Sequence, residues 1–139
     1  MIAVVDASAI ASILVPEPQT PHAERLLDTG YELIAPDHLQ IEIYSVLLQA
    51  LRRDRLTEDD VVGSLEDFRG MPITLLPSPS CLDAAFAAAK RHGGSVYDAL
   101  YVAAARVRDA TVVTNDRRLA DMAKAEAVPI LMVMDIPLA

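Results

Sequence analysis

The sequence opens with Met1-Ile-Ala-Val-Val-Asp6-Ala-Ser8-Ala-Ile10, the stretch from which the fold is best deduced. Residues 2–5 are apolar and rich in β-branched side chains, which predicts a short buried strand. Asp6 comes directly after this strand, at the edge where ligands bind in open α/β sheets. Because burying a carboxylate is costly, Asp6 requires hydrogen bonds, a partner of opposite charge or a metal ion.

The chain has 139 residues, a length that suits one domain, and we expect that domain to span residues 1–139. Hydrophobic residues make up 53% of the sequence, which is ample for a packed core and argues against disorder. The single cysteine, Cys81, excludes an internal disulfide and a multi-cysteine zinc site.

The net charge is −8, which disfavours broad, non-specific binding of nucleic acid through a basic face. A nucleic-acid substrate stays compatible with this charge if bound cations supply positive charge locally, and a basic protein partner is the alternative. No apolar stretch approaches the roughly 18 residues of a membrane span. Since the first expected strand begins at residue 2, we expect no signal peptide, no membrane association and a cytoplasmic protein.

Strands and helices alternate along the chain. Beyond residues 2–5, strands are expected at 32–35, 73–76, 110–114 and 128–133, and helices at 7–14, 20–27, 37–53, 57–68, 80–92, 95–108 and 117–125. Short strands separated by helices predict an α/β domain whose five-stranded parallel sheet has helices on both faces. Three helix starts carry capping patterns: Thr57 with acids in the next turn, and the boxes that begin at Ser80 and Ser95.

Two acidic residues follow strands, and two lie on helices. Asp116 repeats the situation of Asp6, because it comes just after the β-branched run 111–114. Asp98 is the third residue after the Ser95 cap, where capping alone would explain a carboxylate, although capping and cation binding are compatible. Glu42 borders the apolar stripe of its helix, so it either points inward or extends to water along the edge of the stripe.

If Asp6, Glu42, Asp98 and Asp116 share one pocket, their charges repel unless a proton or a cation neutralises them. A site made only of oxygen ligands suits Mg²⁺ or Mn²⁺ rather than zinc. Such ions can activate water and stabilise the charge that develops during phosphodiester hydrolysis. The pattern therefore permits a metal-dependent hydrolase.

Four blocks of the sequence resemble a PIN domain, and within that family a VapC-type toxin ribonuclease of a type II toxin–antitoxin system. The blocks are residues 4–9, 41–46, 96–105 and 112–119, in the expected order over nearly the whole chain. One departure is Ser45, where many relatives have Asn three residues after the glutamate. This departure puts in doubt a side-chain amide at that place and leaves the carboxylates unaffected.

The resemblance implies a five-stranded parallel sheet in which the strands before Asp6 and Asp116 are neighbours. It also implies that Asp6, Glu42, Asp98 and Asp116 surround Mg²⁺ or Mn²⁺, with Ser8 and Thr114 as polar support. The implied activity is endoribonucleolytic cleavage of RNA. The implied partners are a cognate VapB-like antitoxin whose tail enters the acidic pocket, and a second copy in a homodimer.

Arginines near these blocks have two interpretations. Arg117, with Arg118 beside it, is a candidate for contact with substrate phosphates, and a solvated helix start is the simpler alternative. Arg52, Arg53 and Arg55 form a solvated helix end or, as the minority interpretation, contact RNA.

Two other functions compete with the ribonuclease. One is a PIN-like module with weak or absent catalysis that serves to bind a partner. The other is a receiver or phosphatase domain, which is disfavoured because Ala7 and Ser8 follow Asp6 where such domains usually have a second acid.

Overall fold

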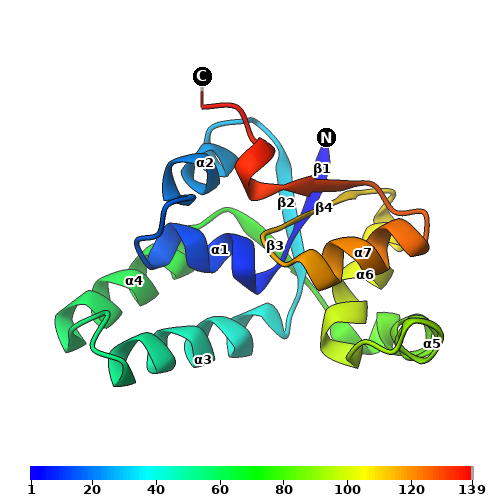
Figure 1. Cartoon of the computed structure of the whole chain (residues 1–139), viewed down its shortest axis with the longest axis horizontal. Coiled ribbons are helices and arrows are strands. Elements are labelled where there is room, and N and C mark those ends of the chain that lie inside the picture. Colours follow the sequence, from blue (N-terminus) through cyan, green and yellow to red (C-terminus); the bar gives the residue numbers. More distant parts are fainter. Residues whose placement is uncertain (139) are drawn as a thin grey trace.

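The structure is a computed structural model that describes residues 1–138, so Ala139 of the expected domain lies outside the described residues. Its sheet has five parallel strands in the order β3-β2-β1-β4-β5 (Figure 1). The strands are β1 (Ile2–Val5), β2 (Glu32–Pro36), β3 (Ile73–Leu76), β4 (Thr111–Thr114) and β5 (Ile130–Met132). The predicted class, an α/β domain with a five-stranded parallel sheet, is confirmed.

The strand order reverses beside β1, which has β2 on one side and β4 on the other. Val4 pairs with Ile34, and Val5 pairs with Val113. The carboxyl ends of β1 and β4 therefore lie next to each other at the topological switch point, where α/β sheets bind ligands.

The helices lie on both sides of the sheet, with α1 to α4 on one side and α5 to α7 on the other (Figure 1). They are α1 (Ala7–Leu14), α2 (Thr20–Glu24), α3 (Leu39–Arg52), α4 (Glu58–Gly70), α5 (Leu82–His92), α6 (Val96–Arg108) and α7 (Arg117–Ala125). Short 3₁₀ turns occupy Arg25–Leu27, Ser78–Cys81 and Val133–Asp135. No helix within residues 1–138 is long and apolar enough to span a membrane.

Helix α6 is buried along an unbroken run from Ala99 to Ala105. Its alanines let the helix lie close to β1, β2 and β4, which it contacts. A helix that is apolar on most sides belongs in the interior of a domain. Its first turn, which carries Asp98, is consequently fixed relative to the carboxyl ends of the central strands.

The predicted helix starts are partly confirmed. Thr57 accepts a hydrogen bond from the Asp60 backbone, and the Asp60 carboxylate accepts one from the Thr57 backbone, which completes a capping box. Ser95 also caps its helix, since its hydroxyl accepts the Asp98 backbone N–H at 3.0 Å. The start predicted at residue 37 is two residues early, because α3 begins at Leu39.

The capping box predicted at Ser80 is wrong. Residues Ser78–Cys81 form a 3₁₀ turn, and α5 begins at Leu82 after it. Asp37, at the end of β2, accepts hydrogen bonds from the Ser78 backbone at 3.2 Å and from the Ser78 hydroxyl. The Ser80 hydroxyl donates to the Pro77 carbonyl at 2.7 Å. A contact between distant segments thus ties down this turn and moves the helix start.

Candidate active site

Asp6 is buried at the carboxyl end of β1, with only 4% of its surface exposed. Its side chain caps α1, because Oδ1 accepts the Ala9 backbone N–H at 2.9 Å. Burial raises the pKa of Asp6 to about 6, although hydrogen bonds from Thr114, Ala9 and Ser8 oppose the rise, and the charge of Asp116 adds to it. Asp6 is therefore a carboxylate whose negative charge is poorly compensated.

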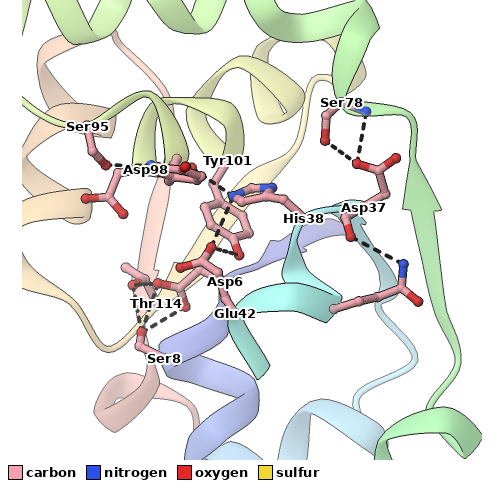
Figure 2. A network of polar contacts seen from close by, with 12 residues as sticks. Asp6, Ser8, Asp37, His38, Glu42, Ser78, Ser95, Asp98, Tyr101 and Thr114 are labelled. Carbon is pink, nitrogen blue, oxygen red and sulfur yellow. Dashed lines mark hydrogen bonds and ion pairs between the residues drawn. The ribbon is translucent and has the colours of Figure 1, made fainter. Parts of the chain in front are cut away.

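Two hydroxyl groups connect Asp6 to the end of β4 (Figure 2). Thr114 Oγ1 donates to Asp6 Oδ2 at 2.6 Å and accepts the Asp116 backbone N–H at 2.9 Å. Ser8 Oγ donates to the Asp6 carboxylate at 2.8 Å and accepts the Asn115 backbone N–H at 2.9 Å. Ser8 and Thr114 thus fix the loop that carries Asp116 relative to Asp6.

Asp116 follows β4 and caps α7, since Oδ1 accepts the Arg118 backbone N–H at 2.8 Å. Its charge raises the pKa of Asp6 and also that of Asp98. The carboxylate is therefore close enough to influence acids on two other elements, β1 and α6. Asp6 and Asp116 meet at one sheet edge, as their positions after strands predicted.

Asp98 lies in the first turn of α6, where its backbone rather than its carboxylate completes the Ser95 cap. Burial raises the pKa of Asp98, and the negative charges of Asp116 and Glu42 raise it further. The Ser95 hydroxyl and His38 oppose this rise only in part. Gly94, just before the helix, leaves room for Met122 of α7, because a Cβ there would collide with the Met122 side chain.

Glu42 is turned toward His38 and Tyr101, and 33% of its side chain is exposed. The Tyr101 hydroxyl donates to Glu42 Oε1 at 2.7 Å, and His38 Nε2 lies 3.1 Å from the same oxygen (Figure 2). Burial raises the pKa of Glu42, but the hydrogen bonds from His38 and Tyr101 outweigh it, so the pKa is lowered. Because both partners contact Oε1, Oε2 is the oxygen left for a ligand.

Two residues that contact Glu42, His38 and Tyr101, were not predicted from the sequence as part of the site. His38 precedes Glu42 by one helical turn, and Tyr101 follows Asp98 by three residues, so both spacings place them near the acids. Burial and the Glu42 charge raise the pKa of Tyr101, which keeps its hydroxyl protonated as a donor. His38 Nε2 also contacts the Tyr97 carbonyl at 3.0 Å, which ties the start of α3 to α6.

Two hollows open beside Asp98. One is a cleft of about 660 Å³ along α3, lined by Glu42, Ser45 and Arg53 among others, and the second, of about 800 Å³, is bounded by α7 and includes Arg118. Ser95 and Asp98 line both. We refer to these as the α3 cleft and the α7 hollow.

The predicted substrate contact at Arg117 is not tested by this geometry. Arg117 is exposed at the start of α7, whereas its neighbour Arg118 lines the α7 hollow. Arg117 therefore stays a prediction, and Arg118 has the more favourable position. Ser45 lies in the α3 cleft on the same side of α3 as Glu42, so the residue that departs from the usual Asn faces the site.

The acids offer the hard oxygen donors that Mg²⁺ and Mn²⁺ prefer. None of the salt bridges within residues 1–138 involves Asp6, Asp98 or Asp116, and the charge of Asp116 raises the pKa values of Asp6 and Asp98. In this same part of the chain, no three Asp, Glu, His or Cys side chains are gathered into a ready set of metal ligands. The site thus fits a divalent cation by charge and donor type without a preformed cage.

Comparison with known proteins shows the family to which this fold belongs. The PIN domain family matches residues 3–125, and the chain belongs to that family. Within it the chain is of the VapC type. It is similar to ribonuclease VapC3 of Pyrobaculum aerophilum, with 38% identity over 130 residues that cover 91% of this chain and 98% of that protein.

Two solved structures share the fold. PAE2754 from Pyrobaculum aerophilum has a TM-score of 0.69 and 21% sequence identity, with 96% of this chain and 90% of that chain covered. VapBC2 from Rickettsia felis, solved bound to a DNA fragment from its promoter, gives a TM-score of 0.68 at 12% identity, with coverage of 95% and 98%.

Proposed function

We propose that this protein is the toxin of a type II toxin–antitoxin system and acts as a metal-dependent endoribonuclease. The observation that carries the proposal is the group of unpaired acids at the switch point, with Asp98 exposed to two hollows. The similarity to a protein named ribonuclease VapC3 supports RNA as the substrate.

In this proposal Asp6, Asp98 and Asp116 hold Mg²⁺ or Mn²⁺, and Glu42 completes the site directly or through a water molecule. A divalent cation supplies a nucleophile from water at neutral pH and stabilises charge on the phosphate. Ser8 and Thr114 keep Asp6 and the Asp116 loop in place through their hydrogen bonds. One of these carboxylates accepts the proton of the attacking water.

The partner in this proposal is an antitoxin with a basic tail. An excess of unpaired carboxylates beside an open cleft favours a basic side chain from a partner as well as a metal ion. The solved VapBC2 structure, which shares this fold, is consistent with such a pairing. A homodimer remains a prediction from the family resemblance.

The test uses purified protein and RNA in the presence or absence of Mg²⁺ or Mn²⁺. We expect cleavage only with metal, and we expect Asp6→Ala and Asp98→Ala to abolish it. Cleavage that survives either substitution would contradict the ribonuclease proposal. Absence of cleavage together with intact antitoxin binding would favour the alternative, a partner-binding module without catalysis.

The toxin role is tested separately in cells. Expression of the chain alone should arrest growth, and co-expression of the small neighbouring reading frame should relieve the arrest. Growth that is unaffected by the wild-type chain would contradict the toxin assignment, whatever the outcome of the cleavage assay.

A further inference from the structure

The α3 cleft and the α7 hollow meet at one place, the first turn of α6. Ser95 and Asp98 line both spaces, so the acidic site lies at their junction rather than at a closed end. A ligand in the α3 cleft and a ligand in the α7 hollow would therefore both contact Asp98. This arrangement suits a chain-like ligand better than a compact one.

Each space has one arginine that lacks an acidic partner within residues 1–138. Arg53 lines the α3 cleft, and Arg118 lines the α7 hollow. Arg55 also lines the α3 cleft, but its guanidinium lies 3.9 Å from Glu17, another lining residue. Arg53 and Arg118 are thus the cations available to an anionic ligand on either side of Asp98.

The α3 cleft combines this charge with an apolar wall. Val15, Ile41, Val46 and Ala50 contribute to its lining, and Tyr97 lies at its rim with 66% of its surface exposed. Sites for single-stranded nucleic acid commonly pair cations that contact phosphates with aromatic and apolar surfaces that contact bases. The α3 cleft has both kinds of surface, in a protein whose overall charge is −8.

The distance between Glu42 and Arg53 along α3 determines which phosphate Arg53 can contact. From Glu42 to Arg53, the residue that caps the end of α3, the helix rises roughly 16 Å, at about 1.5 Å per residue. Arg53 is therefore too far from Glu42 to touch the phosphate at the acidic site. It can only contact a phosphate several positions away along the same strand.

We propose that the α3 cleft and the α7 hollow form one continuous track for a single RNA strand, in which Arg53 binds a phosphate on one side of the acidic site and Arg118 binds a phosphate on the other. The track rests on the proposed ribonuclease function, because it assigns subsites of the same substrate. It defines the substrate as a flexible, unpaired strand that is held on both sides of the cleaved bond.

The test compares basic side chains in an Asp98→Asn background, with Mg²⁺ present and fluorescent oligouridylates of increasing length as the probe. Arg53→Gln and Arg118→Gln should each weaken binding of a long oligouridylate about 10-fold, the effect of one charge-assisted contact. Each should also lower the slope of log K against log salt by about 0.7. Arg52→Gln and Lys124→Gln are matched controls on α3 and α7, since both side chains belong to exposed residues that line neither space.

Strand length distinguishes one track from two separate sites. For a long strand, the losses of binding free energy caused by Arg53→Gln and Arg118→Gln should add. A strand of two or three nucleotides is too short to contact both arginines, so at most one of the two substitutions should weaken its binding. Equal losses in the control variants, or additive losses for the shortest strands, would overturn the track. Cleavage of RNA in the Asp98→Asn background would instead show that the proposed function has failed.

Discussion

Two carboxylates, that of half-buried Glu126 and that of buried Asp6, show opposite ways of placing an acid in this protein. The Glu126 side chain, 8% exposed at the end of α7, contacts Arg91, His92 and Arg106. Hydrogen bonds from Arg91 and His92 lower its pKa to about 2. Asp6, 4% exposed, has only hydroxyl and backbone donors, and burial raises its pKa to about 6.

The contrast separates an acid whose charge is compensated within the fold from one whose charge is not. Glu126 joins α5 and α6 to the end of α7, so its charge is compensated within the fold. Asp6 shares its surroundings with Asp116, whose charge makes the imbalance larger. An acid that the fold leaves uncompensated is the one expected to bind an external cation.

The largest expected difference between the surroundings of Asp6 and those of Glu126 concerns the rate of RNA cleavage. Asp116→Asn should lower the rate at least about 100-fold, because a metal ligand matters at least as much as the outer partners that orient it. Asparagine can still cap α7, so the fold should persist. Glu126→Gln should leave the rate unchanged. Equal rates for wild type and Asp116→Asn in a metal-dependent assay would remove Asp116 from the site.

The second difference is in stability without metal. The pKa of Asp6 is raised from 3.8 to about 6, so the folded protein binds the proton more tightly and loses stability as the pH rises through this range. Above pH 6 in EDTA, Asp6→Asn should be more stable than wild type by on the order of 2 kcal/mol. Urea denaturation between pH 4 and 8 measures this difference.

Bound Mg²⁺ should reverse the order of stability of the wild type and Asp6→Asn. Saturating Mg²⁺ should stabilise the wild type more than Asp6→Asn, because the variant lacks one of the carboxylates proposed to bind the ion. If Asp6→Asn is the less stable protein at pH 7.5 in EDTA, then the hydrogen bonds of Asp6 outweigh the cost of its charge, and the contrast with Glu126 fails.

A smaller effect is expected from the residues that orient Glu42. Tyr101→Phe removes the hydroxyl that donates to Glu42 Oε1 and should weaken Mn²⁺ binding about 10-fold, as measured by calorimetry. Tyr44→Phe is the matched control, because the Tyr44 hydroxyl is exposed and accepts a hydrogen bond from Arg69 away from the acids. An equal loss of Mn²⁺ affinity in the two variants would mean that Tyr101 does not act through Glu42.

The smallest effect concerns the stability supplied by Glu126. Glu126→Gln should cost about 1 kcal/mol at pH 7, a modest value because Arg91 and Arg106 are largely exposed. A lowered pKa stabilises the fold above the ordinary value of 4.5, and the contribution disappears as the pH falls toward 2. The difference in melting temperature between wild type and variant should therefore shrink from pH 5 to pH 3. A difference that is constant over this range would exclude an electrostatic origin.

Features with a local cause were predicted correctly from the sequence. Alternating strands and helices gave the α/β class, and a carboxylate directly after a β-branched run placed Asp6 and Asp116 at the edge of the sheet. Both inferences work because backbone periodicity and chain direction are properties of short segments. The Thr57 capping box was confirmed for the same reason.

Features that depend on distant contacts were not predicted. The Ser80 capping box failed because Asp37, far away in the sequence, binds the preceding turn at Ser78. The orientation of Glu42 stayed open because its partner Tyr101 is separated from it by 59 residues. His38 gave no pattern that distinguishes a core histidine from one that contacts an acid.

The sequence by itself determined the fold class and the sheet edge at which the acids Asp6 and Asp116 gather, since short-range hydrophobic patterns specify strands and their direction. Only the tertiary structure decided which acids are compensated. In the sequence, nothing distinguishes the carboxylate of Glu126 from that of Asp6. The cations around Glu126 come from two other helices, α5 and α6. Charge balance is a property of spatial neighbours, so it emerges only when the chain is folded.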